Sequence, residues 1–174
     1  MRSNRRPKKC FTMRRIQYRK SQLIFLLTLR FAIGWHVLYE GISKVINPQW
    51  TSADFLHESR GILAGFSEWI LSNPNLLATV DLLNAWGLVL IGLALIFGFL
   101  FRPAAIIGSI LIFIYYLSVP PLVGYEYTLP SDGSNLIINR TLIEAIALFG
   151  LALFPTNRIF GLDYFIPSLF KRKT

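Results

Sequence analysis

Residues 22–44 read QLIFLLTLRFAIGWHVLYEGISK, and this stretch decides the fold class. Residues 22–42 are mostly apolar, and about 20 helical residues are enough to cross the hydrocarbon core of a bilayer. The stretch therefore predicts a transmembrane helix. It differs from a cleaved signal peptide because Arg30 interrupts the apolar run and Gly34-Trp35-His36 offers no small-x-small cleavage site.

Three further segments have the length and apolar content of a membrane span. They are residues 82–101, with an extension towards Asn75 left open, residues 103–119 and residues 135–154. Prolines follow the third and fourth segments, where a helix has to end. The sequence predicts an all-α membrane protein, a four-transmembrane-helix bundle with an amphipathic helix in its outer loop.

The connection Phe101-Arg102-Pro103 is very short, so the second and third helices are expected to form an antiparallel hairpin. Small residues flank it at the small-xxx-small spacing that lets helices approach closely in lipid. These residues are Ala94 and Gly98 before the turn, and Ala104 and Gly108 after it. We expect them to hold the hairpin together.

Positive charge sets the expected orientation. Nine of the eighteen Lys and Arg residues lie before Ser21, with no acid among them. Such a tail could bind nucleic acid, but it adjoins an apolar run, which favours a cytoplasmic flank near anionic lipid. We predict a basic tail (residues 1–21), a membrane domain (residues 22–165) and a basic C-terminus (residues 166–174). Both termini are expected in the cytoplasm of a bacterial-type inner membrane, with no nucleic-acid partner.

The loop between the first two spans is long enough to have structure of its own. Apolar residues recur at helical spacing between Thr51 and Ser72, and Trp50 and Trp69 suit the headgroup zone. We predict one interfacial amphipathic helix, with a break at Gly61 left open and an end at Asn73-Pro74. It either caps a membrane site or merely packs on the surface.

Ionisable residues inside the spans are the candidates for function, because charge in a bilayer is costly and has to be buried and paired. The candidate polar cluster is Arg30, Glu40, Lys44, Arg140 and Glu144. Depth along the helices predicts the pairs Arg30–Glu144 and Glu40–Arg140. The alternative is that these charges only lock two helices together. Arg30, Gly34, Val37, Gly41 and Lys44 share one helix face.

A candidate pocket wall surrounds the cluster near the outer side. It comprises His36, Asn84, Trp86, Tyr115 and Tyr116. Such aromatic and hydrogen-bonding groups suit a quinone head, although the tyrosines alone are typical of an ordinary aromatic belt. Two histidines and one cysteine, Cys10, are too few for a metal cluster or a disulfide framework. We find no haem, flavin or metal motif, and quinone is the one cofactor that the sequence suggests.

Motifs along the chain resemble the DoxX family of four-helix membrane proteins. They are Arg30-x3-Gly34-x6-Gly41-x2-Lys44 followed by Trp50, Gly92…Gly98 leading into Phe101-Arg102-Pro103, and Asn139…Glu144 leading to Phe154-Pro155-Thr156-Asn157-Arg158. The resemblance covers residues 22–163. It implies a four-helix bundle, and the family includes the larger subunit of thiosulfate:quinone oxidoreductase. It implies no catalytic residues for this chain.

Three functions remain in competition. The first is a quinone-interacting or accessory subunit of a membrane oxidoreductase assembly, whose polar cluster binds quinone or a small anion. The second is a non-enzymatic scaffold that stabilises a partner or forms a homo-oligomer. A small-solute transporter is disfavoured, since no inverted repeat or broken helix is apparent. The sequence leaves open whether the chain is itself an enzyme.

Overall fold

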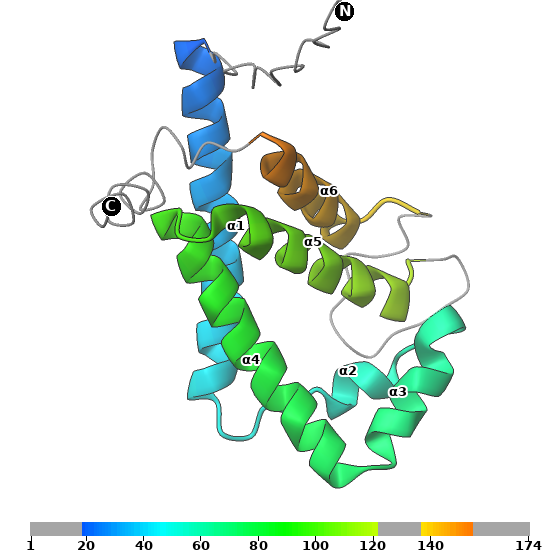
Figure 1. Cartoon of the computed structure of the whole chain (residues 1–174). Helices are drawn as coiled ribbons and strands as arrows, with labels where there is room; N and C mark the ends of the chain where they lie inside the picture. Colours follow the sequence, from blue (N-terminus) through cyan, green and yellow to red (C-terminus); the bar gives the residue numbers. More distant parts are fainter. Residues whose placement is uncertain (1–18, 122–136, 155–174) are drawn as a thin grey trace, which may run out of the picture.

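A computed structural model of the chain describes residues 19–121 and 137–154. Within these ranges every regular element is a helix (Figure 1), as the sequence predicts. The elements are α1 (Lys20–Ile46), α2 (Ala53–His57), the 3-10 helix η1 (Gly61–Leu63), α3 (Ala64–Leu71), α4 (Pro74–Phe97), α5 (Phe101–Ser118) and α6 (Arg140–Leu153). Residues 1–18 of the predicted basic tail (residues 1–21) and the whole predicted basic C-terminus (residues 166–174) lie outside the described residues.

Three of these helices, α1, α4 and α5, are long and apolar enough to cross a membrane. Their lengths are about 40, 36 and 27 Å at 1.5 Å per residue. The predicted fourth span is shorter than expected. Among the described residues α6 has 14 residues, or about 21 Å, against a hydrocarbon core of about 30 Å.

The late start of α6 has a local cause. Asn139 is its N-cap, and the Asn139 side-chain oxygen accepts a hydrogen bond from the Leu142 backbone N–H at 2.9 Å. An asparagine in this role satisfies a backbone donor that has no partner inside the helix. Arg140 is consequently the first residue of α6.

Glycines bring α1 and α4 into backbone contact. A Cβ added at Gly92 would lie 2.6 Å from the backbone of Leu38, and one added at Gly41 would lie 2.6 Å from the backbone nitrogen of Val89. Gly34 is almost as close to α4, with Leu95 Cβ at 3.0 Å. This confirms the predicted glycine-bearing face of the first helix and shows that it meets α4.

The predicted α4–α5 hairpin is looser than expected. Its connection is short, and Gly98 ends α4 in the left-handed conformation (φ +67°) with its N–H bonded to the Ala94 carbonyl at 2.9 Å. From this turn α4 and α5 diverge (Figure 1), and α5 packs more extensively against α6. Small residues therefore hold α1 to α4 more than α4 to α5, although Gly108 still approaches Ile91.

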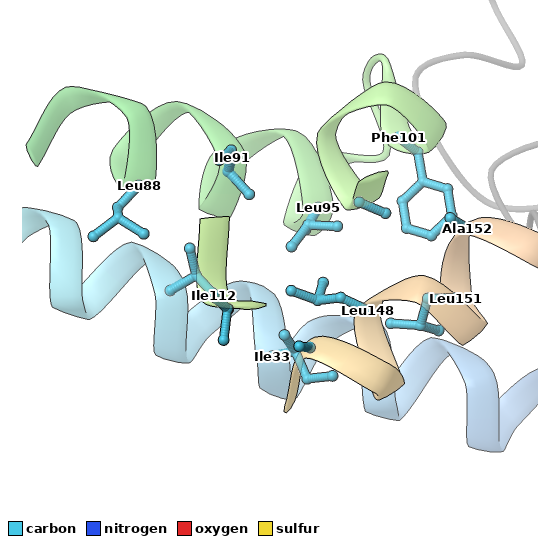
Figure 2. Close-up of a cluster of buried hydrophobic side chains, with 12 residues drawn as sticks. Ile33, Leu88, Ile91, Leu95, Phe101, Ile112, Leu148, Leu151 and Ala152 are labelled. Atoms are coloured by element: carbon cyan, nitrogen blue, oxygen red, sulfur yellow. The ribbon is translucent and has the colours of Figure 1, made fainter. Parts of the chain in front are cut away.

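The hydrophobic core lies where the four long helices meet. Figure 2 shows Leu95 of α4, Phe101 of α5 and Leu148 of α6 converging there, and all three are fully buried. Large apolar side chains are also exposed on the outward faces of every long helix, including Phe25, Leu90 and Ile107. Continuous exposed apolar surface of this kind fits contact with lipid.

Two arginines donate to the last turns of neighbouring helices. Arg30 of α1 is buried, its guanidinium lies over the Phe101 ring, and one of its N–H groups bonds the Ile96 carbonyl near the end of α4 at 3.3 Å. Arg102 of α5 bonds the Ala152 carbonyl near the end of α6 at 3.3 Å. The final carbonyls of a helix have no partner within it and attract cations.

The segment between α1 and α4 is helical but is not one continuous helix. The chain leaves α2 at residue 58 and turns at Gly61, whose φ of +69° favours glycine. The Arg60 N–H donates to the Ser118 carbonyl at 2.8 Å, which ties this break to the end of α5. Pro74 opens α4, so the upstream extension of the second span is confirmed.

Candidate functional site

A cavity of about 570 Å³ lies between the C-terminal halves of α1 and α5, the middle of α4, the start of α6 and the chain that follows α1. It contains four residues of the predicted polar cluster, namely Glu40, Lys44, Arg140 and Glu144, and three of the predicted wall, namely His36, Asn84 and Tyr115. Its volume lies within the range of small-molecule sites. Seven of the ten candidate residues chosen from the sequence therefore lie around one cavity.

The α1 side of the cavity follows from helical geometry. His36, Glu40 and Lys44 are spaced four residues apart, which places them one above another along one stripe of α1. Gly34 and Gly41 lie on the adjacent stripe that packs against α4. The tight glycine contact thus fixes the rotation of α1 and turns its polar stripe into the cavity.

Lys44, Asn84 and Tyr115, which come from three different helices, form a hydrogen-bonded triad. The Asn84 side-chain oxygen accepts hydrogen bonds from the Tyr115 hydroxyl at 2.7 Å and from the Lys44 ammonium at 3.3 Å. The ammonium also lies over the rings of Trp50 and Tyr115, with its nitrogen 5.0 and 5.5 Å from the ring centroids. Aromatic faces attract a cation in this position, so the triad holds the positive charge of Lys44 at the aromatic wall of the cavity.

Asp81 near the start of α4 anchors the segment that covers the cavity. Its carboxylate accepts hydrogen bonds from the Thr51 hydroxyl at 2.9 Å, from the Ser52 backbone N–H at 2.8 Å and from the Ser52 hydroxyl. Phe55 of α2 then packs edge-on against Tyr115, with 5.5 Å between ring centroids. These contacts hold Trp50 and α2 against one side of the cavity.

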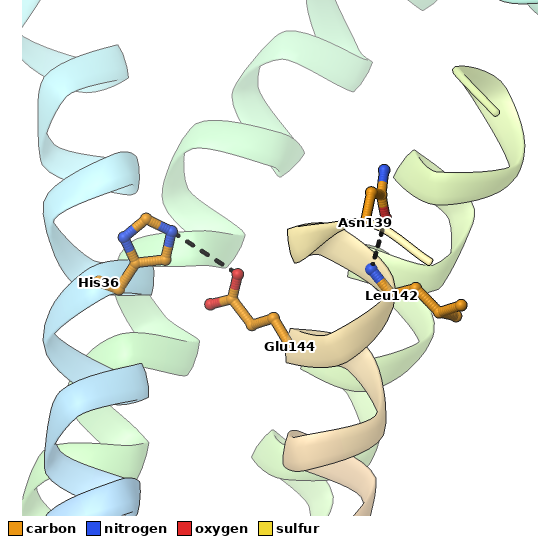
Figure 3. A network of polar contacts seen from close by, with 4 residues as sticks. All are labelled: His36, Asn139, Leu142 and Glu144. Carbon is orange, nitrogen blue, oxygen red and sulfur yellow. Dashed lines mark hydrogen bonds and ion pairs between the residues drawn. The ribbon is translucent and has the colours of Figure 1, made fainter. Parts of the chain in front are cut away.

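His36 and Glu144 face each other between α1 and α6 (Figure 3). The His36 Nε2 and Glu144 Oε2 atoms are 3.6 Å apart. The other carboxylate oxygen of Glu144 is buried and has no hydrogen-bond partner in the described part of the chain. A buried carboxylate oxygen in this situation is a strong acceptor for a donor supplied from elsewhere.

The structure corrects the predicted pairing of Arg30 with Glu144. Glu144 faces His36, whereas Arg30 reaches the end of α4. Depth along a helix fixes the level of a side chain but not its direction, and Arg30 lies on the stripe of α1 that faces α4. Glu40 and Arg140 do line one cavity, and their direct ion pair stays a prediction.

Three predicted residues lie away from the cavity. Arg30 is at the opposite end of the α1–α4 contact. Trp86 is on the outward face of α4 with 51% of its surface exposed. Tyr116 stacks on Phe113 and donates its hydroxyl proton to the Ile137 carbonyl at 2.8 Å.

Several lining residues were not singled out from the sequence. They are Asn47, Gln49, Thr51, Ser52, Asp54, Phe55 and Thr141. Most belong to the short segment after α1. Its signals are the Asn47-Pro48 turn and the hydroxyl pair Thr51-Ser52, but nothing in the sequence pairs those hydroxyls with Asp81.

A family model for DoxX matches residues 25–120, which is more than half of the chain. The chain belongs to the DoxX family. Comparisons with curated proteins and with solved structures found no match. The match to DoxX covers most of α1 and all of α2 to α5, and it confirms the resemblance seen in the sequence over that range. The part of the resemblance beyond residue 120 lies outside the match.

The DoxX match divides the cavity into two parts. His36, Glu40, Lys44, Asn84 and Tyr115 lie within the matched residues, whereas Arg140, Thr141 and Glu144 of α6 do not. Family membership and the three apolar helices together identify a membrane protein. The ligand has to be argued from the cavity itself.

Proposed function

We propose that this DoxX protein is a membrane-embedded binding subunit whose outer cavity holds the head of a quinone, and that it serves a membrane oxidoreductase assembly. The observation that carries the proposal is the Lys44–Asn84–Tyr115 triad inside a 570 Å³ cavity. A quinone head is a flat ring with two carbonyl oxygens. It suits a site with aromatic walls and a few hydrogen-bond donors.

Lys44 is the expected donor to one carbonyl oxygen. An ammonium group has three N–H donors, and within the described residues the structure gives it one hydrogen bond, to Asn84. Trp50, Phe55 and Tyr115 supply aromatic surface on the same side. At the far side His36 and Glu144 provide a second hydrogen-bonding pair, which can hold the other oxygen or the proton of a reduced head.

The donor set fits a quinone but supplies no electron carrier. A bound quinone would accept or release electrons, and this chain's residues would bind and orient it and exchange protons. The protein therefore needs a partner that carries the electron cofactor, and we propose that this partner is another membrane subunit.

Binding is tested with the full chain in lipid nanodiscs. We expect purified protein to retain quinone detectable by mass spectrometry and to bind added ubiquinone-1. Lys44→Met should weaken ubiquinone-1 binding roughly tenfold, which corresponds to the loss of about one charge-assisted hydrogen bond. Lys20→Met, at the exposed start of the same helix, is the matched control. No binding by the wild-type protein, or equal binding by Lys44→Met, contradicts the proposal.

A second candidate is a scaffold without redox chemistry. It is favoured by the outer helix α3, on which Phe66 and Trp69 are exposed while Ser67 and Ile70 are buried. This face could lie in the headgroup zone or against a partner or a second copy. Co-purification of a partner that lacks visible absorption, from protein that binds no quinone, would replace the first proposal with this one.

The proposed topology has four spans, with α6 as the fourth, and both termini in the cytoplasm of a bacterial-type inner membrane. Its support is the basic N-terminal segment and the cationic Arg102 turn. Cys10 is the one cysteine of the chain, so it is a natural reporter. A membrane-impermeant maleimide should label it after cell lysis but not in intact cells, and labelling in intact cells would reverse the orientation.

A further inference from the structure

A second hollow, the α1–α6 groove, adjoins the cavity. It has a volume of about 660 Å³ and is lined by Ala32, Ile33 and His36 of α1, by Ile138 and Asn139, and by Arg140, Ile143 and Glu144 of α6. Its surface is mostly apolar. His36, Arg140 and Glu144 line both hollows, so the groove and the cavity meet at the His36–Glu144 pair shown in Figure 3.

The groove lies at mid-height of the longest helix. Ala32 is 12 residues from the start of α1 and 14 from its end, or about 18 and 21 Å. In a bilayer with a core about 30 Å thick, this is hydrocarbon depth. The side chains at the groove agree with that level, because Ile138 and Ile143 are apolar and exposed.

From this continuity we infer that the groove is a lateral portal, through which the site takes an amphiphile from the bilayer. The polar head of the ligand lies in the cavity at Lys44 and Tyr115, and its long apolar tail leaves between α1 and α6 along Ala32 and Ile143. This inference rests on the proposed function for the head group. It adds that the ligand is a tailed molecule delivered from lipid, not from water.

The change of surface along this path supports the assignment. Polar groups make up a larger share of the cavity surface than of the groove surface, and the groove beyond His36 is apolar. If lipid already fills the groove, an apolar tail that enters it is not transferred out of water, so the groove contributes little to the binding affinity. The groove instead provides a path for the ligand, since the long tail could not extend from the cavity into the bilayer if the groove were closed.

The test is a pair of bulky substitutions on α6. Ile143 lines the groove and Ile146 does not, and the two are similarly exposed, at 58% and 63%. In nanodiscs of phosphatidylethanolamine and phosphatidylglycerol, Ile143→Trp should lower ubiquinone-10 binding at least fivefold and leave ubiquinone-1 binding within twofold of wild type. Ile146→Trp should change neither. Ala32→Trp, from the opposite wall, should reproduce the effect of Ile143→Trp.

Each outcome has a distinct meaning. Normal ubiquinone-10 binding by both Ile143→Trp and Ala32→Trp overturns the portal while leaving the head site intact. An equal loss of both quinones also overturns it, because the groove would then belong to the head site. If wild-type protein binds neither quinone, the proposed function fails and the portal fails with it.

Discussion

The α1–α4 contact and the α1–α6 contact use the same helix in opposite ways. Towards α4, glycines bring α1 into backbone contact, and a single added methyl group has no space. Towards α6, α1 presents His36 to a carboxylate across a cavity and an adjoining groove. The comparison teaches that rigidity and function are divided between two stripes of one helix, and four changes can test this division.

The largest effect is expected from Gly92→Ala. Its new Cβ would lie 2.6 Å from the Leu38 backbone, which cannot move away as a flexible side chain could. Overpacking of this kind costs about 3 kcal/mol. Thermal unfolding in detergent should show a clear fall in Tm.

Gly87→Ala is the matched control on the same helix. Nothing lies within 4 Å of a Cβ at Gly87, and alanine is favoured over glycine in a helix by roughly 0.5–1 kcal/mol. Its Tm should stay equal or rise. Equal Tm values for the two variants would show that the α1–α4 contact is not tight.

Arg30→Met should have the next largest effect, about 2 kcal/mol, because it removes a donor to a buried helix end. Arg30 is 4% exposed. Arg102→Met removes a similar bond from an exposed side chain and should cost less. Urea unfolding followed by circular dichroism compares the two, and a larger loss for Arg102→Met would contradict the assignment.

Asp81→Asn should loosen the cover of the cavity without unfolding the helices. An amide oxygen keeps one acceptor, but the second side-chain atom becomes a donor and can no longer accept the Thr51 or Ser52 bonds. Hydrogen exchange should quicken at residues 50–57 and stay unchanged in α1. Uniform acceleration across the chain would mean that Asp81 supports the whole fold.

The smallest effect is expected from the His36–Glu144 pair. The His36 side chain is 44% exposed, and the contact is long at 3.6 Å. A double-mutant cycle with His36→Ala and Glu144→Ala should give a coupling free energy below about 1 kcal/mol in thermal unfolding. A larger coupling would make this contact a structural lock and weaken its role as the boundary between cavity and groove.

Much of the candidate site could be predicted from the sequence, and the predictions that failed have a common cause. The sequence placed Lys44 on the helix face that carries Gly34 and Gly41, whereas the structure shows that His36, Glu40 and Lys44 line the cavity together. The predicted partner of Arg30 was wrong because the limits of a span give the depth of a side chain in the membrane but not the direction in which it points. The second helix was expected to continue to Phe101, but Gly98 ends it early and brings the Ile96 carbonyl to Arg30.

The helix partners were also beyond the sequence. The spacing of small residues shows that a helix face allows close approach, but it does not show which neighbouring helix packs against that face. Gly41 and Gly92 could both be read in the sequence, yet close helix packing was predicted for the small residues beside the α4–α5 turn instead. The anchoring of Ser52 by Asp81, 29 residues away, depends on a loop path that no periodicity encodes.

The two arginine contacts at helix ends have a consequence for biosynthesis. Arg30 and the carbonyl it binds are 66 residues apart, and Arg102 and its carbonyl are 50 apart. In each case the arginine is synthesised well before the residue whose carbonyl accepts its hydrogen bond. Each contact can therefore form only after the later helix has been made, so the contact between α1 and α4 can form before α6 exists and the contact between α5 and α6 cannot.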